Sequence, residues 1–314
     1  MKKWYPYCVS VDWLQLYSKI IDPQKFTESR IGNFKLTIKN VQTVNYLKIA
    51  TVFFFENKVS QVAKKFATIT YAPRSSVLPP NACHVKLENE ELYTNNFLKK
   101  LQKFYTQYNL QYISITRLDI AYDFNRLFNG VLPTKIIHDF FLQKILKIGV
   151  QTGYLNFNNF GYKIATGATR VSKDFKVGFP NINAITWGCK SSGNETQLYN
   201  KSLELRNKTY KPWIVDAWEA AGLNTSADVW RLEFRIQNRC KELQALESGD
   251  LFGLGINEIA DKHRIEELFL AYAHKNFRFV KRDYHVKKTE MKPLQFLCLR
   301  SDNQVSIKPK MHQN

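Results

Sequence analysis

The sequence predicts an α+β protein with a largely antiparallel sheet and flanking helices. Segments in which apolar and polar residues alternate recur along the chain, as in strands that bury one face and expose the other. Segments with apolar residues at helical spacing lie among them. Because strands and helices follow one another in mixed order, a doubly wound parallel sheet is disfavoured.

Eight segments show the strand pattern, in which side chains point alternately to the two faces of a sheet. The expected strands are Tyr7–Leu14, Phe34–Val41, Ile49–Phe55, Ala67–Tyr71, Tyr112–Phe124, Ala184–Trp187, Thr196–Lys201 and Trp230–Gln237.

Four segments show helical spacing, with apolar residues every three or four positions. One of them opens with Pro212 and is followed by Gly222, the asymmetry that favours a helix between the two. The expected helices are Leu92–Tyr108, Pro133–Ile148, Pro212–Ala221 and Asn257–Phe277.

The composition is that of a folded, strongly basic protein. The 314 residues include 46 Lys and Arg against 27 Asp and Glu, a formal charge of +19, with 44% hydrophobic and 14% aromatic residues. So many apolar residues exclude a disordered chain. The charge predicts a polyanionic partner, with nucleic acid as the first candidate and a basic surface kept only for solubility as the alternative.

Targeting and redox signals point to a cytoplasmic protein. No apolar run approaches the ~20 residues of a membrane span, so no membrane association is expected, and the first residues lack the apolar core of a signal peptide. The five cysteines are too far apart along the chain for zinc or redox motifs. We therefore expect reduced thiols.

Three regions are expected along the chain: an N-terminal α+β half (1–110), a catalytic half (111–245) and a helical, basic C-terminal extension (246–314). Residues 275–310 hold ten Lys and Arg against three acidic residues. Such an extension either grips a phosphate backbone or is an ordinary solvated end.

Familiar nucleotide and metal motifs are absent from the sequence. It has no G-x-x-x-x-G-K-[ST] phosphate loop, and its six histidines form neither a His-x-His pair nor an H-E-x-x-H site. A catalytic metal would therefore be held by carboxylates, which suits Mg²⁺ or Mn²⁺.

Three of the expected strands carry charged residues on one face. The first segment, 116–124, places Arg117, Asp119 and Asp123 on one face. The second, 230–236, aims Arg231, Glu233 and Arg235 together, and the third, 197–204, aligns Gln197, Tyr199 and Lys201.

These residue types supply the parts of a tyrosine-based phosphoryl transfer. Carboxylates hold a divalent ion, arginines neutralise the developing charge on phosphorus, and a tyrosine supplies the attacking oxygen. The alternative is a set of solvated strand faces. Tyr199 is one of sixteen tyrosines, and Tyr210 is the other candidate for the nucleophile. For Glu204, the alternative interpretation is a surface ion pair with Arg206 or Lys208. Asp12 is left out of the site.

The ordered motifs resemble a known family. Residues 117–123 (RLDIAYD), 199–204 (YNKSLE) and 231–233 (RLE), with 9–14 (VSVDWL) and the lead-in 186–192 (TWGCKSS), resemble the replication initiation factor (Rep_trans) family over roughly residues 7–240. The family contains rolling-circle plasmid and phage initiators and relaxases of conjugative elements. The resemblance implies an HUH-endonuclease-like (RRM or ferredoxin-like) core, with two pseudo-repeated halves as an option.

The resemblance implies an enzyme that nicks origin DNA and transfers the strand through a 5′-phosphotyrosine. Tyr199 would be the nucleophile, and Mg²⁺ or Mn²⁺ would be the cofactor. Lys201, Arg117 and Arg231 would steady the phosphate. The implied metal ligands are Asp119 and Glu233, followed by Asp123 and Glu204.

DNA is the expected partner, both as an origin duplex or hairpin and as a single strand, with a second copy of the chain and a host helicase as further candidates. Cations expected to bind DNA are Arg235, Lys190, Lys281, Arg282, Lys287 and Lys288.

Other functions stay open at this point. A conjugative relaxase would carry out the same chemistry, and an origin-binding protein that never cuts DNA would have the same excess of positive charge. His274, Arg278 and Tyr284 faintly suggest a tyrosine recombinase, but that family's arginine spacing is missing.

Overall fold

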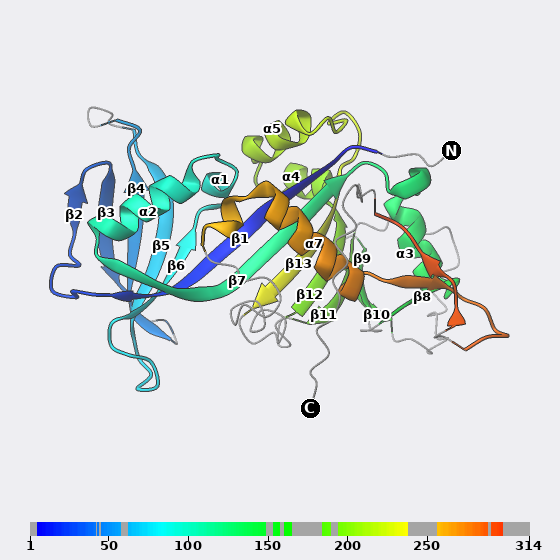
Figure 1. Ribbon diagram of the computed structural model, residues 1–314, viewed down its shortest axis with the longest axis horizontal. Coiled ribbons are helices and arrows are strands. Elements are labelled where there is room, and N and C mark those ends of the chain that lie inside the picture. Colours follow the sequence, from blue (N-terminus) through cyan, green and yellow to red (C-terminus); the bar gives the residue numbers. More distant parts are fainter. Residues whose placement is uncertain are drawn as a thin grey trace, which may run out of the picture.

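The computed structural model describes residues 5–41, 43, 45–57, 62–148, 153–157, 160–164, 184–189, 194–237, 256–287 and 290–297. Most of its strands form one antiparallel, twelve-stranded sheet in the order β10-β9-β11-β12-β13-β7-β1-β6-β5-β4-β3-β2 (Figure 1). The expected α+β class with an antiparallel sheet and flanking helices is confirmed.

Two long central strands hold the sheet together. β1 (Tyr7–Ile20) and β7 (Leu110–Phe124) pair antiparallel along almost their whole length. Because β1 belongs to the first expected region and β7 to the second, these two regions share one sheet. The division of the chain into three regions stays a prediction.

Shorter strands extend the sheet on both sides of this central pair. Beyond β7 lie β13 (Trp230–Gln237), β12 (Asn194–Asn200), β11 (Ala184–Cys189), β9 (Gly153–Phe157) and β10 (Phe160–Ile164). Beyond β1 lie β6 (Ala82–Leu87), β5 (Lys64–Pro73), β4 (Tyr46–Phe54), β3 (Phe34–Asn40) and β2 (Ser29–Ile31).

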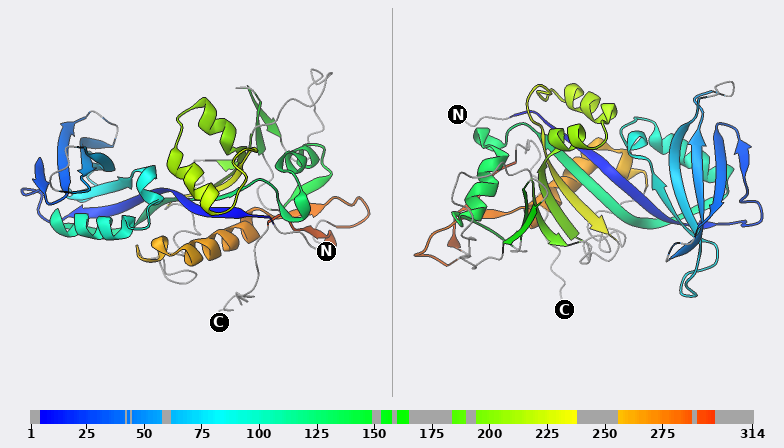
Figure 2. Two further views of the ribbon diagram at one scale, coloured as in Figure 1. Left: turned by 90° about the horizontal axis from the view of Figure 1, so that it is seen from above. Right: turned by 180° about the vertical axis from the view of Figure 1, so that it is seen from behind.

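Helices lie on both faces of the sheet. Figure 2, seen from above, shows α2 (Phe97–Gln107) and α7 (Lys262–Asn276) on one side and α4 (Lys201–Asn207) with α5 (Pro212–Ala220) on the other. The short α1 (Asn89–Leu92) follows β6. A separate three-stranded sheet, β15-β14-β8, lies at one end, with β8 (Ile145–Lys147), β14 (Phe279–Lys281) and β15 (Pro293–Leu294) near α3 (Pro133–Phe141).

Aromatic packing fixes α7 on the sheet. The ring of Phe269 stacks on Tyr122 of β7, with centroids 5.2 Å apart, and lies 5.0 Å from the ring of Phe234 on β13. All three side chains are fully buried. A second apolar cluster lies under α4 and α5 and includes Ile214, Trp218 and Val229. The core therefore fills both faces of the sheet near β7 and β13.

Most expected elements are present, and the exceptions have local reasons. β13 has the expected bounds, whereas the expected helix from Pro133 ends at Phe141 and the chain continues as strand β8. The backbone at Gln143, with φ 56°, interrupts the helix there. No helix among the described residues is long and apolar enough to span a bilayer.

Removing the aromatic anchor of α7 should destabilise the fold. Phe269→Ala deletes a fully buried ring between two strands, so we expect a loss of ~3–5 kcal/mol in the free energy of unfolding. Tyr284→Ala, at a side chain that is 79% exposed, is the control and should change it by less than ~0.5 kcal/mol. Urea denaturation measures both; equal effects would contradict the packing described.

Candidate active site

A β-bulge lies where β1 runs along the polar face of the sheet. Val11 pairs with Ile120 and Trp13 with Asp119, so Asp12 is the extra residue of β1 at this point. Ser10 pairs with Ala121 of the polar face, so ordinary alternation already places Asp12 on that face, and the bulge turns Trp13 onto it as well. Asp12 and Trp13 therefore both line the same cleft. Asp12, which was left out of the expected site, thus belongs to the cleft.

Strand register sets the rest of the polar face. Asp119 of β7 pairs with Arg235 of β13, and Asp123 pairs with Arg231. On the other side of β13, Arg231 pairs with Tyr199 of β12. Directly paired residues share a face, so the three charged strands predicted from the sequence are brought together.

Arg231 lies at the centre of a buried ion-pair network. Its Nε and Nη2 donate to the two carboxylate oxygens of Asp123 at 2.6 and 2.7 Å, and its Nη1 donates to Oδ1 of Asp12 at 2.5 Å. Nη2 also donates to the hydroxyl of Tyr93 at 3.1 Å. The arginine side chain has no exposed surface. Although burial opposes its charge, Asp12 and Asp123 raise the pKa of Arg231 well above its usual range.

Asp12 is held ionised by the cations around it. Burial alone would raise the pKa of its carboxyl, but Arg231, Lys201 and Lys211 bring that pKa below its usual range. Asn89 donates to Oδ1 of Asp12 at 3.2 Å, which further favours the charged form.

Tyr199 meets a carboxylate and an ammonium group in the cleft. Its hydroxyl donates to Oε2 of Glu233 at 2.8 Å, and Nζ of Lys201 lies 3.4 Å from the same hydroxyl oxygen. Lys201 was expected on the strand, but it lies in the first turn of α4. The side chain of Asn200 caps that helix by accepting from the backbone N–H of Leu203 at 2.9 Å.

Glu233 and Tyr199 have unusual protonation equilibria. Burial, together with the charges of Asp12 and Asp119, raises the pKa of Glu233 to about 7. Burial and the neighbouring Glu233 raise the pKa of the Tyr199 hydroxyl well above its usual range. At rest, therefore, Tyr199 is a phenol whose hydrogen-bond acceptor titrates near neutral pH.

Asp119 is bracketed by two arginines. Nε of Arg117 donates to its Oδ1 at 2.9 Å, and Nε of Arg235 lies 3.4 Å from its Oδ2. Burial still raises the pKa of Asp119, against the opposing effect of both arginines. Arg235 also pairs with Glu195 at 2.7 Å, and the guanidinium of Arg117 lies 4.1 Å above the ring of Trp13.

These side chains line a cleft of ≈ 1330 Å³ between β6, the central strands, α4 and the start of α5. The cations in its lining are Lys64, Lys65, Lys86, Arg117, Lys201, Lys208, Lys211 and Arg235, and the carboxylates are Asp12, Glu88, Glu90, Asp119, Glu204 and Glu233. The cleft is thus basic overall, with its carboxylates interleaved among the cations.

Two of the predicted site residues lie away from the cleft lining. Asp123 and Arg231 are fully buried, and the indole N–H of Trp218 donates to Oδ2 of Asp123 at 2.7 Å. The structure thus places the polar atoms of Asp123 and Arg231 against each other, and the roles of metal ligand for Asp123 and phosphate contact for Arg231 stay predictions. Glu204 does line the cleft, where it bridges Lys201 at 2.6 Å and Lys208 at 2.9 Å.

The predicted DNA-binding cations are dispersed. Arg235 lies in the cleft, whereas Lys281, Arg282 and Lys287 belong to the region around β14 and are not part of the cleft lining. Lys190 and Lys288 lie outside the described residues. Tyr210, the competing tyrosine, is 65% exposed and does not line the cleft.

The carboxylates as arranged do not fit the expected metal centre. Among the described residues, no three His, Cys, Asp or Glu side chains gather closely enough to hold an ion. Asp119 and Glu204 are each engaged by two cations, and Asp123 by Arg231. The binding of Mg²⁺ or Mn²⁺ stays a prediction, and no chemical step is derived through it.

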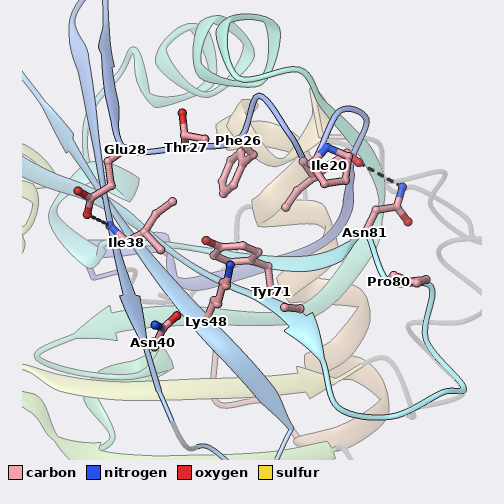
Figure 3. A pocket seen from close by; sticks show the side chains of 12 residues that line it. Ile20, Phe26, Thr27, Glu28, Ile38, Asn40, Lys48, Tyr71, Pro80 and Asn81 are labelled. Atoms are coloured by element: carbon pink, nitrogen blue, oxygen red, sulfur yellow. Dashed lines mark hydrogen bonds between the residues drawn. The ribbon is translucent and has the colours of Figure 1, made fainter.

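A second hollow, of ≈ 550 Å³, lies far from these groups between β1, β3, β4 and β5 (Figure 3). Its lining mixes apolar and polar side chains, and its one carboxylate, Glu28, accepts from the backbone N–H of Ile38 at 2.6 Å. With Lys48 as its one cation, this hollow gathers far fewer charged groups than the cleft.

Comparisons with known proteins find a likeness among solved structures. Neither protein-family models nor curated proteins match the sequence. Among solved structures, the chain is similar to a rolling circle replication initiator protein from Geobacillus stearothermophilus, with a TM-score of 0.49 and 14% identity over 92% of this chain and 93% of that chain.

Breaking the Arg231 network should destabilise the protein strongly. Arg231→Met leaves Asp12 and Asp123 buried without their cation, so we expect a loss of ~3–5 kcal/mol in the free energy of unfolding. The control, Arg206→Met, removes an arginine that is 60% exposed and pairs with Asp228, so its effect should stay within ~1 kcal/mol. Chemical denaturation compares the two, and similar losses would show that the network adds no stability.

The raised pKa of Glu233 predicts a particular pH dependence of stability. A carboxyl whose folded pKa lies above its unfolded value stabilises the fold fully below the unfolded pKa and loses this contribution as pH rises through the folded pKa of about 7. Glu233→Gln should therefore be more stable than the wild type above pH ~7, by up to ~3 kcal/mol, and equal to it near pH ~4.

Glu204 provides a control of opposite sign. Burial opposes its charge, but Lys201 and Lys208 lower the pKa of Glu204, so its contribution is present at neutral pH and is lost as pH falls. Glu204→Gln should destabilise the protein near pH 7 and have little effect in acid. Denaturation curves across pH measure both variants; the same sign for both would refute the electrostatic assignment.

Proposed function

We propose that this protein nicks one strand of DNA and transfers it through a covalent link to Tyr199. One observation carries the proposal: a tyrosine hydroxyl lies in a basic cleft, hydrogen-bonded to a carboxyl with a pKa of about 7 and 3.4 Å from an ammonium group. A nucleophile, a base poised near neutral pH and cations for a phosphate are the parts that such a reaction needs.

Glu233 is suited to act as the general base. Once ionised, it accepts the phenolic proton through the 2.8 Å hydrogen bond. Without this transfer Tyr199 stays protonated, because burial raises the pKa of its hydroxyl. Nζ of Lys201 stabilises the resulting phenolate, in a position fixed by the first turn of α4.

The bond changes follow from this geometry. The phenolate oxygen attacks the phosphorus, a tyrosine O–P bond forms, and the bond to the 3′-oxygen breaks. The 3′-oxygen then takes up a proton from water and is left as a free hydroxyl. Lys201, Arg117 and Arg235 offset the negative charge that develops on the phosphate oxygens.

Cleavage at an origin, followed by priming from the free 3′-hydroxyl, would start rolling-circle replication of a plasmid, phage or other mobile element. The likeness of the strand motifs to replication initiation factors supports this biological role. A conjugative relaxase would use the same residues in the same way, so the genetic neighbourhood of the coding sequence separates the two roles.

The direct test is a nicking assay with the tyrosine variant. Purified protein is incubated with supercoiled DNA carrying the sequence around its own gene, in parallel with Mg²⁺, with Mn²⁺ and with a chelator. The wild type should relax the DNA and stay attached to the 5′ end of the nicked strand. Tyr199→Phe should abolish the attachment, because the phenol oxygen is lost while the packing of the ring is kept.

Tyr210→Phe is the matched control, because it removes the hydroxyl of an exposed tyrosine near the same helix and should leave nicking unchanged. An adduct formed by Tyr199→Phe would refute the assignment of the nucleophile. A wild type that binds this DNA but never cuts it would favour a binding protein that recruits other replication enzymes.

A further inference from the structure

Four neighbouring strands beside the cleft carry positive charge only. β3, β4, β5 and β6 together contain six lysines and no Asp or Glu. The cleft, by contrast, mixes both signs. This region therefore concentrates positive charge in the half of the sheet that lies away from the nucleophile.

The register of these strands builds a row of polar side chains that leads out of the cleft. Lys86 of β6 pairs with Thr68 of β5, Thr68 with Thr51 of β4, and Thr51 with Thr37 of β3. We call these four residues the threonine track. Directly paired residues share a face, so the track crosses four strands, a distance of ~14 Å. Lys86 at its inner end also lines the cleft.

The track lies on the face opposite α2. That helix packs through Phe104 against Phe34 and Phe66. On β3 the buried Phe34 and Leu36 alternate with Lys35, Thr37 and Lys39, so the last three point to the other face. Figure 2, seen from behind, shows no helix of the described chain over these strands.

Exposed lysines border the outer end of the track. Lys35 and Lys39 flank Thr37 on β3, and both are exposed. No ion pair within the described residues neutralises either of them. At the inner end, Lys65 pairs with Glu88 at 2.7 Å, and Nζ of Lys86 lies 3.8 Å above the ring of Trp13. Burial lowers the pKa of Lys86, with Glu88 opposing this effect and the charges of Lys65 and Arg117 adding to it.

Aromatic rings lie beside the track rather than on it. Phe53 follows Thr51 by two residues on β4, and His84 precedes Lys86 by two residues on β6, where its ring lies 5.5 Å from that of Tyr17. Cations and hydroxyls that follow a backbone, with rings at the side for unpaired bases, are typical of surfaces that bind single strands.

We infer that the threonine track, with Lys35 and Lys39, binds the single-stranded DNA backbone that continues from the phosphate held in the cleft. This inference rests on the proposed function, because it takes the cleft as the place where a strand is cut. Its occupant is a single strand because the track is one residue wide, continuous with the cleft and bordered by rings. The hydroxyl of Thr37 donates to the carbonyl of Thr51 and that of Thr68 to Glu88, both over long distances of 3.4 Å that a phosphate oxygen can replace. The lysines bind phosphates, so the surface extends the binding site without reading sequence.

The test measures binding without cleavage, in the Tyr199→Phe background. Lys35→Gln/Lys39→Gln removes the two outer lysines. The matched control, Lys99→Gln/Lys103→Gln, removes two exposed lysines from α2 on the opposite face, so the change in net charge is identical. Fluorescence anisotropy follows three ligands across salt concentrations: single strands of about 24 and about eight nucleotides, and a duplex of about 24 base pairs.

The track variant should bind the longer single strand several-fold more weakly, with a salt dependence of log K reduced by ~1.4 for two lost phosphate contacts. Its binding of the short strand, which the cleft alone accommodates, should be unchanged, as should all binding by the control variant. Equal losses in both double variants, no loss on the longer strand, or a loss confined to duplex would each overturn the inference.

The outcomes also separate this inference from the proposed function. A protein that shows the expected binding losses but never nicks DNA refutes the catalytic role of the cleft alone. A protein that nicks through Tyr199 and binds the longer strand equally well without Lys35 and Lys39 refutes the threonine track alone.

Discussion

The ion pairs of Arg231 are the interaction on which the site depends. A fully buried guanidinium joins Asp123 on β7 and Asp12 on β1, so one side chain of β13 ties together three adjacent strands. A buried charge is tolerated only when its partners satisfy it, and removing either side leaves an uncompensated ion. The network thereby fixes how β13 lies against β7 and β1.

The same register positions the two groups that we propose to react. Tyr199 pairs directly with Arg231 across β12 and β13, and Glu233 lies two residues further along β13 on the same face. The tyrosine hydroxyl and the carboxyl therefore meet without help from a loop. Sites built on strands hold their geometry more accurately than sites built on loops, which suits an attack that needs precise alignment.

Unequal compensation of charge distinguishes Glu233, the proposed base, from the carboxylates of the ion-pair network. Asp123 is matched by Arg231, and Asp12 is held ionised by the same arginine. Burial, with the charges of Asp12 and Asp119, raises the pKa of Glu233 to about 7, and Arg231 and Lys201 offset this only in part. A pair of environments that pushes apart the pKa values of similar groups is a common mark of acid–base sites.

Much of this arrangement could be predicted from the sequence, because strict alternation marks strands with one polar face. Residues 230–237 satisfy that pattern throughout, and both the strand bounds and the shared face of Arg231, Glu233 and Arg235 follow from it. Tyr199 and Glu233 were both singled out from their strand faces, and the structure places them in one hydrogen bond, whereas the roles expected of them stay predictions.

Other features depend on contacts that periodicity does not encode. Trp13 joins Asp12 on the polar face through a bulge, which shifts the alternation by one residue and leaves no mark in the pattern. Asp119 and Asp123 look equivalent along β7, yet only pairing with Arg231 buries Asp123 away from the cleft. Lys201 was assigned to a strand face, whereas the cap at Asn200 starts a helix there.

The location of the covalent link to DNA tests the account most directly. The wild-type protein is reacted with labelled DNA from around its own gene, digested with trypsin and analysed by mass spectrometry. The account predicts that the nucleotide is attached to the peptide of residues 191–201, whose single tyrosine is Tyr199. A nucleotide on any other peptide, such as residues 209–211 with Tyr210, would contradict it.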